Sequence, residues 1–411
     1  MSSANPGRLA ASRTLMAVEE GAHAEDVLAD LAPPQSRDRG LALMLVLGAL
    51  RRQGALDALL QPFVRRGLRT LDPPVRAALR LGAWELQAGR SRAGAVVHQW
   101  VEVAKATVAA PASGLVNAVL RKCVDQPLSD DPMLDMPAWM ARRFKGWDDW
   151  VRRCQEQPPI NIVIRRDLAD PILPHEDCTQ LPNLAKDRVP PPSILRLPPR
   201  AGNVPDLPGF AEGHWFVMDP SAAVVADMVD QWAPPGSVMT ACAAPGGKSF
   251  RLADAGRDVH AVDLVPARLA LLSEGAKRLR LQIHTSAHDW LAGAHPDQGV
   301  HAGVLVDAPC TGLGVIRRHP EIRWRRRKSD VPAMALRQRQ ILENASVHVA
   351  PDGVLVYSVC SPLPEEGSGV VRGLDGWEIV DSWSSAPPAG DEDGFQAYVL
   401  RRTCTLWIRS D

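Results

Sequence analysis

Two cysteines follow segments that are expected to be β-strands. Cys310 comes after the apolar run 303–306 and Asp307, and Cys360 follows the run 353–357. In a parallel sheet both thiols would lie at carboxyl ends of strands, the edge at which open α/β folds bind ligands. A single cysteine is more often a small buried apolar residue. Two in this shared position predict covalent catalysis on an electrophilic substrate, an arrangement that methyl transfer to cytosine C5 requires.

A glycine-rich turn lies at a third expected strand end. Residues 242–248 read CAAPGGK, between an expected strand at 238–242 and an expected helix at 248–255. The glycines let the backbone approach a ligand, and amides at the start of the helix can face an anionic group. Asp263 ends the next strand, where a carboxylate can bind both ribose hydroxyls, and Asp289 is placed to meet an adenine edge. This order predicts a site for S-adenosyl-L-methionine, whose carboxylate would be the anion.

The same turn leaves a nucleotide triphosphatase open as an alternative. Residues 242–249 miss the P-loop pattern only at its first position, and the run 304–307 imitates an apolar strand with a magnesium-binding acid. Cys242 stands where the tight phosphate-wrapping turn needs glycine, and Pro245 removes an amide that phosphates would use. The methyl donor is therefore favoured over the triphosphate.

Composition limits the protein class. The chain has 411 residues, 45% of them apolar, which is enough for two or three domains with full cores. Its formal charge of zero excludes a uniformly basic nucleic-acid binder. Its seven cysteines contain no C-x-x-C pair, so neither a disulfide framework nor a zinc site is expected. The chain lacks a signal-peptide core, and its longest apolar run, 41–50, is too short for a bilayer, so we expect a soluble cytoplasmic protein with no membrane or metal partner.

The chain divides into three segments with different residue patterns. Residues 1–125 show helical spacing with proline breaks and predict an all-α domain of about five helices. Proline-crowded residues 126–213 predict a helical connector and a small α/β module, and 214–411 alternate strand and helix as a doubly wound parallel sheet does. Helices are expected at 248–255 and 266–279. The expected strands of the sheet are 238–242, 259–263, 283–285, 303–307, 354–358, 396–400 and 405–408.

A basic segment directly follows the Cys310 loop. Residues 315–340 hold nine Arg and Lys against two acids, so they could grip RNA phosphates beside the reacting base, although a solvated helical face is the alternative. The residues expected to bind RNA are Arg317, Arg318, Arg323, Arg325, Arg326, Arg327 and Lys328. Residues 1–125 hold sixteen basic against eleven acidic residues, which fits either RNA binding or solvated helix faces. His260, His284 and His301 lack metal-like spacing and are expected to be surface or core residues.

The motifs at 242–248, 307–324 and 357–366 resemble those of the RNA 5-methylcytosine methyltransferase family, also called NOL1/NOP2/Sun. In the first domain, 79–84 and 114–121 are similar to the NusB-like RNA-binding domain of the RsmB (Fmu/Sun) branch. The resemblance implies a Rossmann-like methyltransferase domain behind a NusB-like domain, S-adenosyl-L-methionine as cofactor, and a cytosine of 16S ribosomal RNA as substrate. We expect the protein to act as a monomer.

The resemblance also assigns roles. It implies that Cys360 is the nucleophile, that Cys310 aids product release, and that Asp307 holds the cytosine amino group or N3. The cofactor-binding residues that it implies are Cys242, Ala243, Ala244, Pro245, Gly246, Gly247, Lys248, Asp263, Asp289 and Asp307. Lys248 would lie either near the cofactor carboxylate or in solvent. The chain departs from the family pattern at Thr240, Met218, Gly367 and Gln396, and of these Thr240 is the one expected to loosen the cofactor turn.

The expected chemistry starts at C6 of cytosine. C5 is too weak a nucleophile to attack a sulfonium methyl group, so a thiolate first adds to C6 and makes C5 enamine-like. Methyl transfer, loss of the C5 proton and expulsion of the sulfur follow. The alternatives are a NusB-like RNA-binding or ribosome-assembly protein with weak or no activity, and the triphosphatase. Both cysteines stand in motif context with Asp263 and Asp307, which favours the enzyme.

Overall fold

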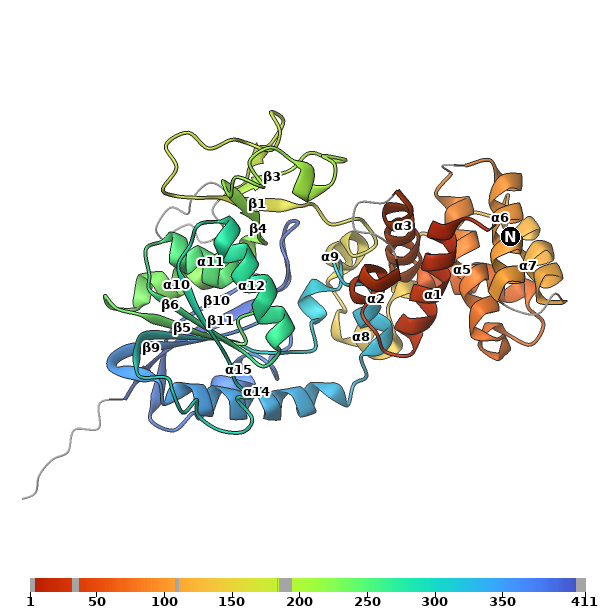
Figure 1. Ribbon diagram of the computed structural model, residues 1–411. Helices are drawn as coiled ribbons and strands as arrows, with labels where there is room; N and C mark the ends of the chain where they lie inside the picture. Colours follow the sequence, from red (N-terminus) through yellow and green to blue (C-terminus); the bar gives the residue numbers. More distant parts are fainter. Residues whose placement is uncertain are drawn as a thin grey trace, which may run out of the picture. The chain divides into compact units, whose positions relative to one another are not determined.

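The computed structural model describes residues 4–31, 37–89, 91–107, 111–182, 184 and 194–403 (Figure 1). The chain forms two compact units. The first contains Met1–Gln157 and Ile316–Arg326, and the second contains Pro158–Val315 and Arg327–Asp411. The helical connector and the small α/β module, which were expected together in 126–213, thus belong to different units.

The described part of the first unit begins with seven α-helices. They are α1 (Pro6–Glu19), α2 (Ala24–Leu31), α3 (Arg37–Arg51), α4 (Gln53–Leu60), α5 (Pro73–Gln87), α6 (Ala93–Thr107) and α7 (Pro111–Cys123), with short 3-10 turns at Gln61–Phe63 and Leu68–Thr70. The Asn5 side chain caps α1 by accepting the amide of Arg8, and proline opens both α1 and α5, where no amide partner is needed. Leu15, Leu45 and Trp100 are fully or almost fully buried in the shared core. Two eight-residue helices, α2 and α4, account for the excess over the number expected.

The connector packs with this helical unit. It contains the 3-10 turn Pro132–Asp135, α8 (Ala138–Arg143) and α9 (Asp148–Arg153), and the unit also includes α13 (Glu321–Arg325) from much later in the chain. Phe144, Trp147 and Trp150 form a ring cluster with centroids 4.9 to 5.6 Å apart. The buried carboxylate of Asp135 accepts the amide of Ala55, which ties the connector to α4.

The second unit begins with a small antiparallel sheet in the order β2-β3-β1-β4. Its strands are β1 (Asn161–Ile164), β2 (Thr179–Gln180), β3 (Ile194–Arg196) and β4 (Trp215–Val217), with a 3-10 turn at Val204–Asp206. Ile162, Leu195 and Trp215 form its core. β4 pairs with β1, so residues after the expected boundary at 213 still belong to this module.

A seven-stranded sheet in the order β10-β11-β9-β8-β5-β6-β7 follows. Its strands are β5 (Val238–Ala241), β6 (Val259–Asp263), β7 (Ile283–Ala287), β8 (His301–Asp307), β9 (Val349–Val359), β10 (Trp377–Ser384) and β11 (Gln396–Arg402). β5 to β9 pair in parallel, whereas β11 pairs antiparallel with β9 and β10. The strands β5 and β8 are nearly all buried, as a sheet covered on both faces requires.

Helices cover both faces of this sheet (Figure 1). One core joins it to α10 (Pro220–Trp232), α11 (Gly247–Asp254) and α12 (Pro266–Arg278), and the other joins it to α14 (Asp330–Ser346) and α15 (Ser368–Val371). The short 3-10 turn Leu313–Val315 lies in the loop after β8. The doubly wound architecture predicted from the alternating pattern is therefore confirmed.

The parallel strands were also found where the sequence placed them. β6 has the expected bounds and β5, β7, β8, β9 and β11 overlap their expected ranges. β10 was not predicted; it is an edge strand in which no residue is buried and in which apolar and polar residues do not alternate regularly. The strand expected at 405–408 lies outside the described residues. Among those described, no helix has the length and apolar character needed to cross a membrane.

Candidate active site

The carboxyl ends of five parallel strands carry the expected site residues in order along one edge of the sheet. Asp289 follows β7, Asp263 ends β6, the turn 242–248 follows β5, Asp307 ends β8 and Cys360 follows β9. From β5 the chain moves through β6 to β7 in one direction, and β8 and β9 lie on the other side of β5. Such a reversal in strand order leaves a crevice at these ends, where open α/β sheets bind their ligands.

The two thiols are in contact. Cys310 Sγ and Cys360 Sγ lie 3.3 Å apart, and neither cysteine is part of a disulfide. A disulfide would need about 2.05 Å between the sulfur atoms, so the pair is joined by a hydrogen bond. The hydrogen bond to Cys360, together with burial, raises the pKa of Cys310 well above its ordinary value. Cys310 therefore keeps its proton at neutral pH and can donate it to the Cys360 sulfur.

Glu366 joins the loops that carry the two cysteines. Its carboxylate is completely buried and accepts the backbone amide of Thr311 at 2.7 Å and the amide of Gln338 at 3.0 Å. The hydroxyls of Thr311 and Ser361 donate to its other oxygen. Thr311 directly follows Cys310 and Ser361 directly follows Cys360. The separation of the thiols is thus set in part by Glu366, which ends the family-like motif at 357–366 but was not among the expected site residues.

A glycine allows the Cys310 loop to reach the backbone of Cys360. The amide of Gly314 donates to the Cys360 carbonyl at 3.0 Å, and its carbonyl accepts the amide of Gly394. A Cβ on Gly314 would lie 1.9 Å from the Gly394 oxygen and 3.0 Å from the Cys360 oxygen. Only glycine fits this backbone contact, so the two cysteine loops are held against each other by main chain as well as by Glu366.

Asp307 ends β8 as the register partner of Ser358, two residues before Cys360, and is oriented by two neighbours. Lys248 Nζ is 2.6 Å from one of its oxygens, and the Ser358 hydroxyl donates to the other at 2.8 Å. The same ammonium lies 4.8 Å from the ring centroid of Phe395. Lys248 was expected near a cofactor carboxylate or in solvent, and the structure instead pairs it with Asp307. The lysine thereby links the glycine turn to the β8 strand end.

The glycine turn is shaped by its neighbours and is open above α11. Gly246 has φ of +115°, and a Cβ there would lie 2.7 Å from Phe250 and 2.8 Å from Leu272, so glycine is required on both counts. No atom lies within 4 Å of the Cβ position of Gly247. The space beside the first residue of α11 is therefore open, and the amides of a helix's first turn suit an anionic group such as the cofactor carboxylate.

Asp263 holds this turn from the next strand. Its two oxygens accept the amides of Ala244 at 3.0 Å and Val265 at 3.1 Å. A carboxylate has about four acceptor sites, so ribose hydroxyls could still bind. Burial, with the nearby charges of Asp263 and Asp307, raises the pKa of Cys242 to about 12. This third thiol is consequently protonated and unsuited to nucleophilic attack.

Two further sequence expectations concern the cofactor side of the site. Asp289 accepts the amide of Leu291 at 2.9 Å, which orders the loop after β7. Thr240, which was expected to loosen the turn, forms a hydrogen bond of 2.9 Å with the hydroxyl of Ser249, and both are buried. This bond ties β5 to α11, so the departure at Thr240 has its own local partner. Met218 is a buried core residue.

The basic segment after Cys310 divides between buried and exposed side chains. Arg323 is completely buried in the first unit and donates to the carbonyls of Asp135 and Cys154, at 3.3 and 3.0 Å. Trp324 donates to the Leu50 carbonyl at 2.8 Å. The expectation that Arg323 binds RNA is therefore wrong, because its guanidinium is used within the fold. A charge count could not separate an arginine that binds carbonyls from one that binds phosphates.

Other members of the segment keep more exposure. Arg317 is mostly buried and lies 3.4 Å from the carboxylate of Glu156, also within the first unit. Arg327 and Lys328 are exposed. Arg318, Arg325 and Arg326 are half-buried. The side chains best placed to meet RNA are thus a subset of those expected.

Two histidines that are 24 residues apart in sequence lie side by side near the amino-terminal ends of β6 and β7, away from the carboxyl strand ends that carry the site. His260 and His284 are register partners on β6 and β7, and their Nε2 atoms lie 3.6 and 3.5 Å from the carboxylate of Asp258. The donor atoms of these three residues lie within 4.8 Å of one another. They could hold a metal ion, although a shared ion pair accounts for the same contacts. Strand pairing produces this cluster, so spacing along the chain gave no sign of it.

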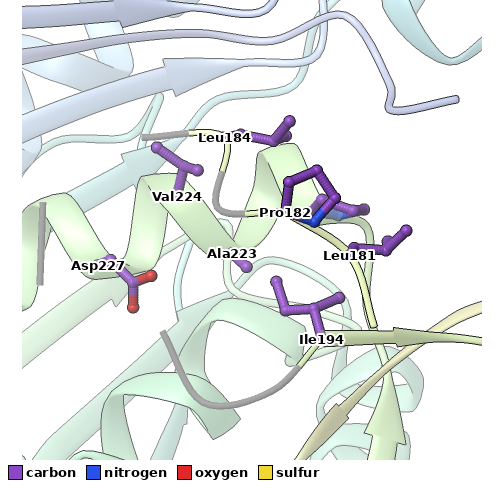
Figure 2. Close-up of a pocket in the computed structure, with 8 residues that line it drawn as sticks. Leu181, Pro182, Leu184, Ile194, Ala223, Val224 and Asp227 are labelled. Atoms are coloured by element: carbon purple, nitrogen blue, oxygen red, sulfur yellow. The ribbon is translucent and has the colours of Figure 1, made fainter. Parts of the chain in front are cut away.

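A small hollow lies away from these strand-end residues (Figure 2). Figure 2 shows it between Leu181, Pro182, Leu184, Ile194 and the α10 side chains Ala223 and Val224. Its charged residue, Asp227, has both oxygens bound by Arg251. None of the expected site residues lines it. Because its walls are aliphatic and its acid is paired, this hollow is a packing gap of the module and does not provide the polar groups that a cofactor needs.

Comparison with known proteins places the chain in a family. The family model described as 16S rRNA methyltransferase RsmB/F matches residues 231–375, and the NusB family model matches 5–125. Ribosomal RNA small subunit methyltransferase B of Pseudomonas putida is 33% identical over 90% of this chain and 88% of its own length. The chain belongs to the RsmB family of methyltransferases. Ribosomal RNA small subunit methyltransferase B of Thermus thermophilus is 35% identical over 89% of this chain and 86% of its own length.

Two solved structures share the fold of this chain. The crystal structure of PH0851 matches with a TM-score of 0.77 at 22% identity, over 97% of this chain and 99% of that one. A methyltransferase homologue protein from Pyrococcus horikoshii matches with a TM-score of 0.51 at 20% identity, over 67% of this chain and 98% of that one. The predicted family and the predicted combination of a NusB-like domain with a Rossmann-like methyltransferase fold are therefore confirmed.

Proposed function

We propose that this RsmB-family protein transfers a methyl group from S-adenosyl-L-methionine to C5 of a cytosine in 16S ribosomal RNA. The observation that carries the proposal is the contact between Cys310 and Cys360, at the strand edge that also holds Asp307 and the glycine turn. The named relatives act on small-subunit ribosomal RNA, and the matching family model is described by 16S rRNA. We infer a cytoplasmic monomer that needs no metal ion for this reaction.

Residues of the turn and its neighbours would hold the cofactor. The amides at the start of α11 suit the methionine carboxylate, Asp263 suits the ribose hydroxyls, and Asp289 suits the adenine edge. When bound, S-adenosyl-L-methionine supplies an electrophilic methyl group. Lys248 already neutralises Asp307 in this structure, so the proposed role of its ammonium is to orient the acid beside the substrate.

Cys360 is the proposed nucleophile. Its thiolate adds to C6 of cytosine, and the bond from sulfur to C6 pushes electron density onto C5, which then takes the methyl group. The protonated Cys310 supports this assignment, because its S–H can donate a hydrogen bond to the Cys360 sulfur. Asp307 would accept a hydrogen bond from the cytosine amino group and fix the ring over the thiolate.

Release of the product reverses the addition. The C5 proton leaves to a base, the double bond between C5 and C6 forms again, and the bond from C6 to the Cys360 sulfur breaks. Negative charge returns to that sulfur as it departs. Cys310 is 3.3 Å away and can donate its S–H to the departing thiolate, which makes expulsion easier.

The test compares the two cysteine variants on ribosomal RNA with radiolabelled S-adenosyl-L-methionine. Cys360→Ala should give neither methylated RNA nor a covalent adduct, because addition never begins. Cys310→Ala should add and methylate but release slowly, leaving protein bound to methylated RNA as a slow band on a denaturing gel. Cys178→Ala, in the small module, is the matched control and should behave as wild type. A stalled band with Cys360→Ala and none with Cys310→Ala would exchange the two roles.

A further inference from the structure

Gly367 and Gln396 share one buried space beside the Cys360 loop. Gln396 is the first residue of β11, and only 7% of it is exposed. A Cβ on Gly367 would lie 2.2 Å from Gln396 Oε1 and 2.6 Å from its Cδ. Gly367 has φ of −99° and ψ of −106°, a pair outside the main α and β regions, so both this backbone and the space that the glutamine side chain fills favour glycine there.

The glutamine amide is bonded to the loop that follows Cys360. Gln396 Nε2 donates to the carbonyl of Ser361 at 2.6 Å and to the carbonyl of Leu363 at 3.1 Å. Its Oε1 accepts the Tyr398 hydroxyl at 3.0 Å. Both N–H groups and the oxygen therefore have partners. No other side chain is described as donating to either of these two carbonyls.

The loop that Gln396 binds is connected by hydrogen bonds to the backbone beside both thiols. Ser361 follows Cys360 directly, and its hydroxyl donates to Glu366, whose carboxylate also holds Thr311 beside Cys310. Gln396 itself contacts neither sulfur atom in any recorded hydrogen bond. Its effect on the reaction would pass through the position of the Cys360 backbone.

We propose that Gln396 is a positioning residue for attack by Cys360, and that Gly367 is the small partner that makes room for it. The proposal rests on the function proposed above. Gly367 and Gln396 are also two of the four positions at which the chain departs from the family pattern. Their contact makes these departures one structural exchange, in which the amide from β11 fills the space that a side chain at 367 would need.

Gln396→Met tests the hydrogen bonds while keeping the length of the side chain. The assay is the rate of covalent adduct formation with RNA that carries 5-fluorocytosine, since fluorine cannot leave C5 as a cation and the adduct accumulates. A misplaced nucleophile can cost about 100-fold, so we expect the rate to fall about 10- to 100-fold. Cofactor affinity, measured by calorimetry, should stay within about twofold, because the glycine turn is untouched. A change of less than about twofold in the adduct rate would overturn the proposal.

The exchange predicts that the two positions are coupled. Gly367→Ala should lower the rate as much as Gln396→Met does, since the methyl group displaces the amide. The double variant should be no slower than either single variant. If the reductions in adduct rate of the two single variants multiply in the double variant, the two residues act independently and the shared role is overturned. Val399→Ala, in the buried core of the same strand, is the control for reduced stability and should leave the adduct rate near wild type.

Gln396→Glu provides a second test, because the glutamate side chain has nearly the same shape as glutamine. An ionised carboxylate cannot donate to the Ser361 and Leu363 carbonyls, whereas a protonated one can donate to one of them. Its adduct rate, divided by the wild-type rate at each pH, should rise as the pH falls, and a flat ratio would contradict the proposal. Failure of the wild-type protein to methylate RNA would instead reject the proposed function.

Discussion

Removal of the Glu366 carboxylate should destabilise the second unit and separate the two thiols. Glu366→Ala leaves the amides of Thr311 and Gln338 buried without this acceptor and opens a cavity where the side chain was. Each unsatisfied buried donor costs about 1–3 kcal/mol. The Gln338 amide keeps its bond to the Pro309 carbonyl, so its share is at the low end. We expect a total loss of about 3–5 kcal/mol in the free energy of unfolding.

Glu366→Gln separates the contribution of charge from that of shape. Its oxygen can still accept the two amides, and its NH₂ group can donate to the hydroxyls of Thr311 and Ser361 once these rotate. The loss should therefore be smaller, about 1–3 kcal/mol.

Urea unfolding followed by tryptophan fluorescence measures these differences, and methyl transfer is measured under native conditions. Glu343→Ala is the matched control, since this half-exposed glutamate pairs with Arg339 on the surface of α14 and should cost less than about 1 kcal/mol. Methyl transfer by Glu366→Ala should fall about 100-fold even where the protein is fully folded, because the loops of both cysteines lose their common anchor. Equal stability of Glu366→Ala and Glu343→Ala would refute this reasoning.

Three further changes probe the cofactor site, the RNA surface and the third thiol. Asp263→Ala should weaken S-adenosyl-L-methionine binding in calorimetry by about 1.5–3 kcal/mol, and unchanged affinity would move the ribose elsewhere. Replacing the exposed Arg327 and Lys328 with alanine should lower the salt slope of RNA binding by about 1 each, whereas Arg323→Ala should lower stability and leave that slope unchanged. The raised pKa of Cys242 gives stability that is present below the ordinary thiol pKa near 9.0 and is lost as the pH rises toward about 12. Thermal melts between pH 9 and 12 should thus show a smaller loss for Cys242→Ala than for wild type, and parallel losses would count against the shift.

The sequence by itself determined where most strands of the second unit's large sheet lie along the chain, and the edge of that sheet at which its chemistry lies. Short apolar runs, each followed by a turn or an acid, placed Asp263, Asp307 and Cys360 at carboxyl strand ends, and the structure has strands there. These are local signals, because strand periodicity and turn chemistry depend on neighbours a few residues away. Membership of the family could also be predicted from the sequence, since the family's motifs are continuous stretches of residues.

Only the tertiary structure decided which side chains hold the site together. Glu366 lies 55 residues from Thr311 in sequence, yet its carboxylate joins the two cysteine loops. The buried Arg323 reads as a phosphate ligand by charge alone, but it binds backbone carbonyls of a unit formed by residues far earlier in the chain. Gly367 and Gln396 are two separate departures in the sequence, but in the structure the Gln396 side chain fills the space that a side chain at 367 would need. Residue type gives the charge and size of a side chain, whereas its partner is set by packing between segments that sequence spacing does not relate.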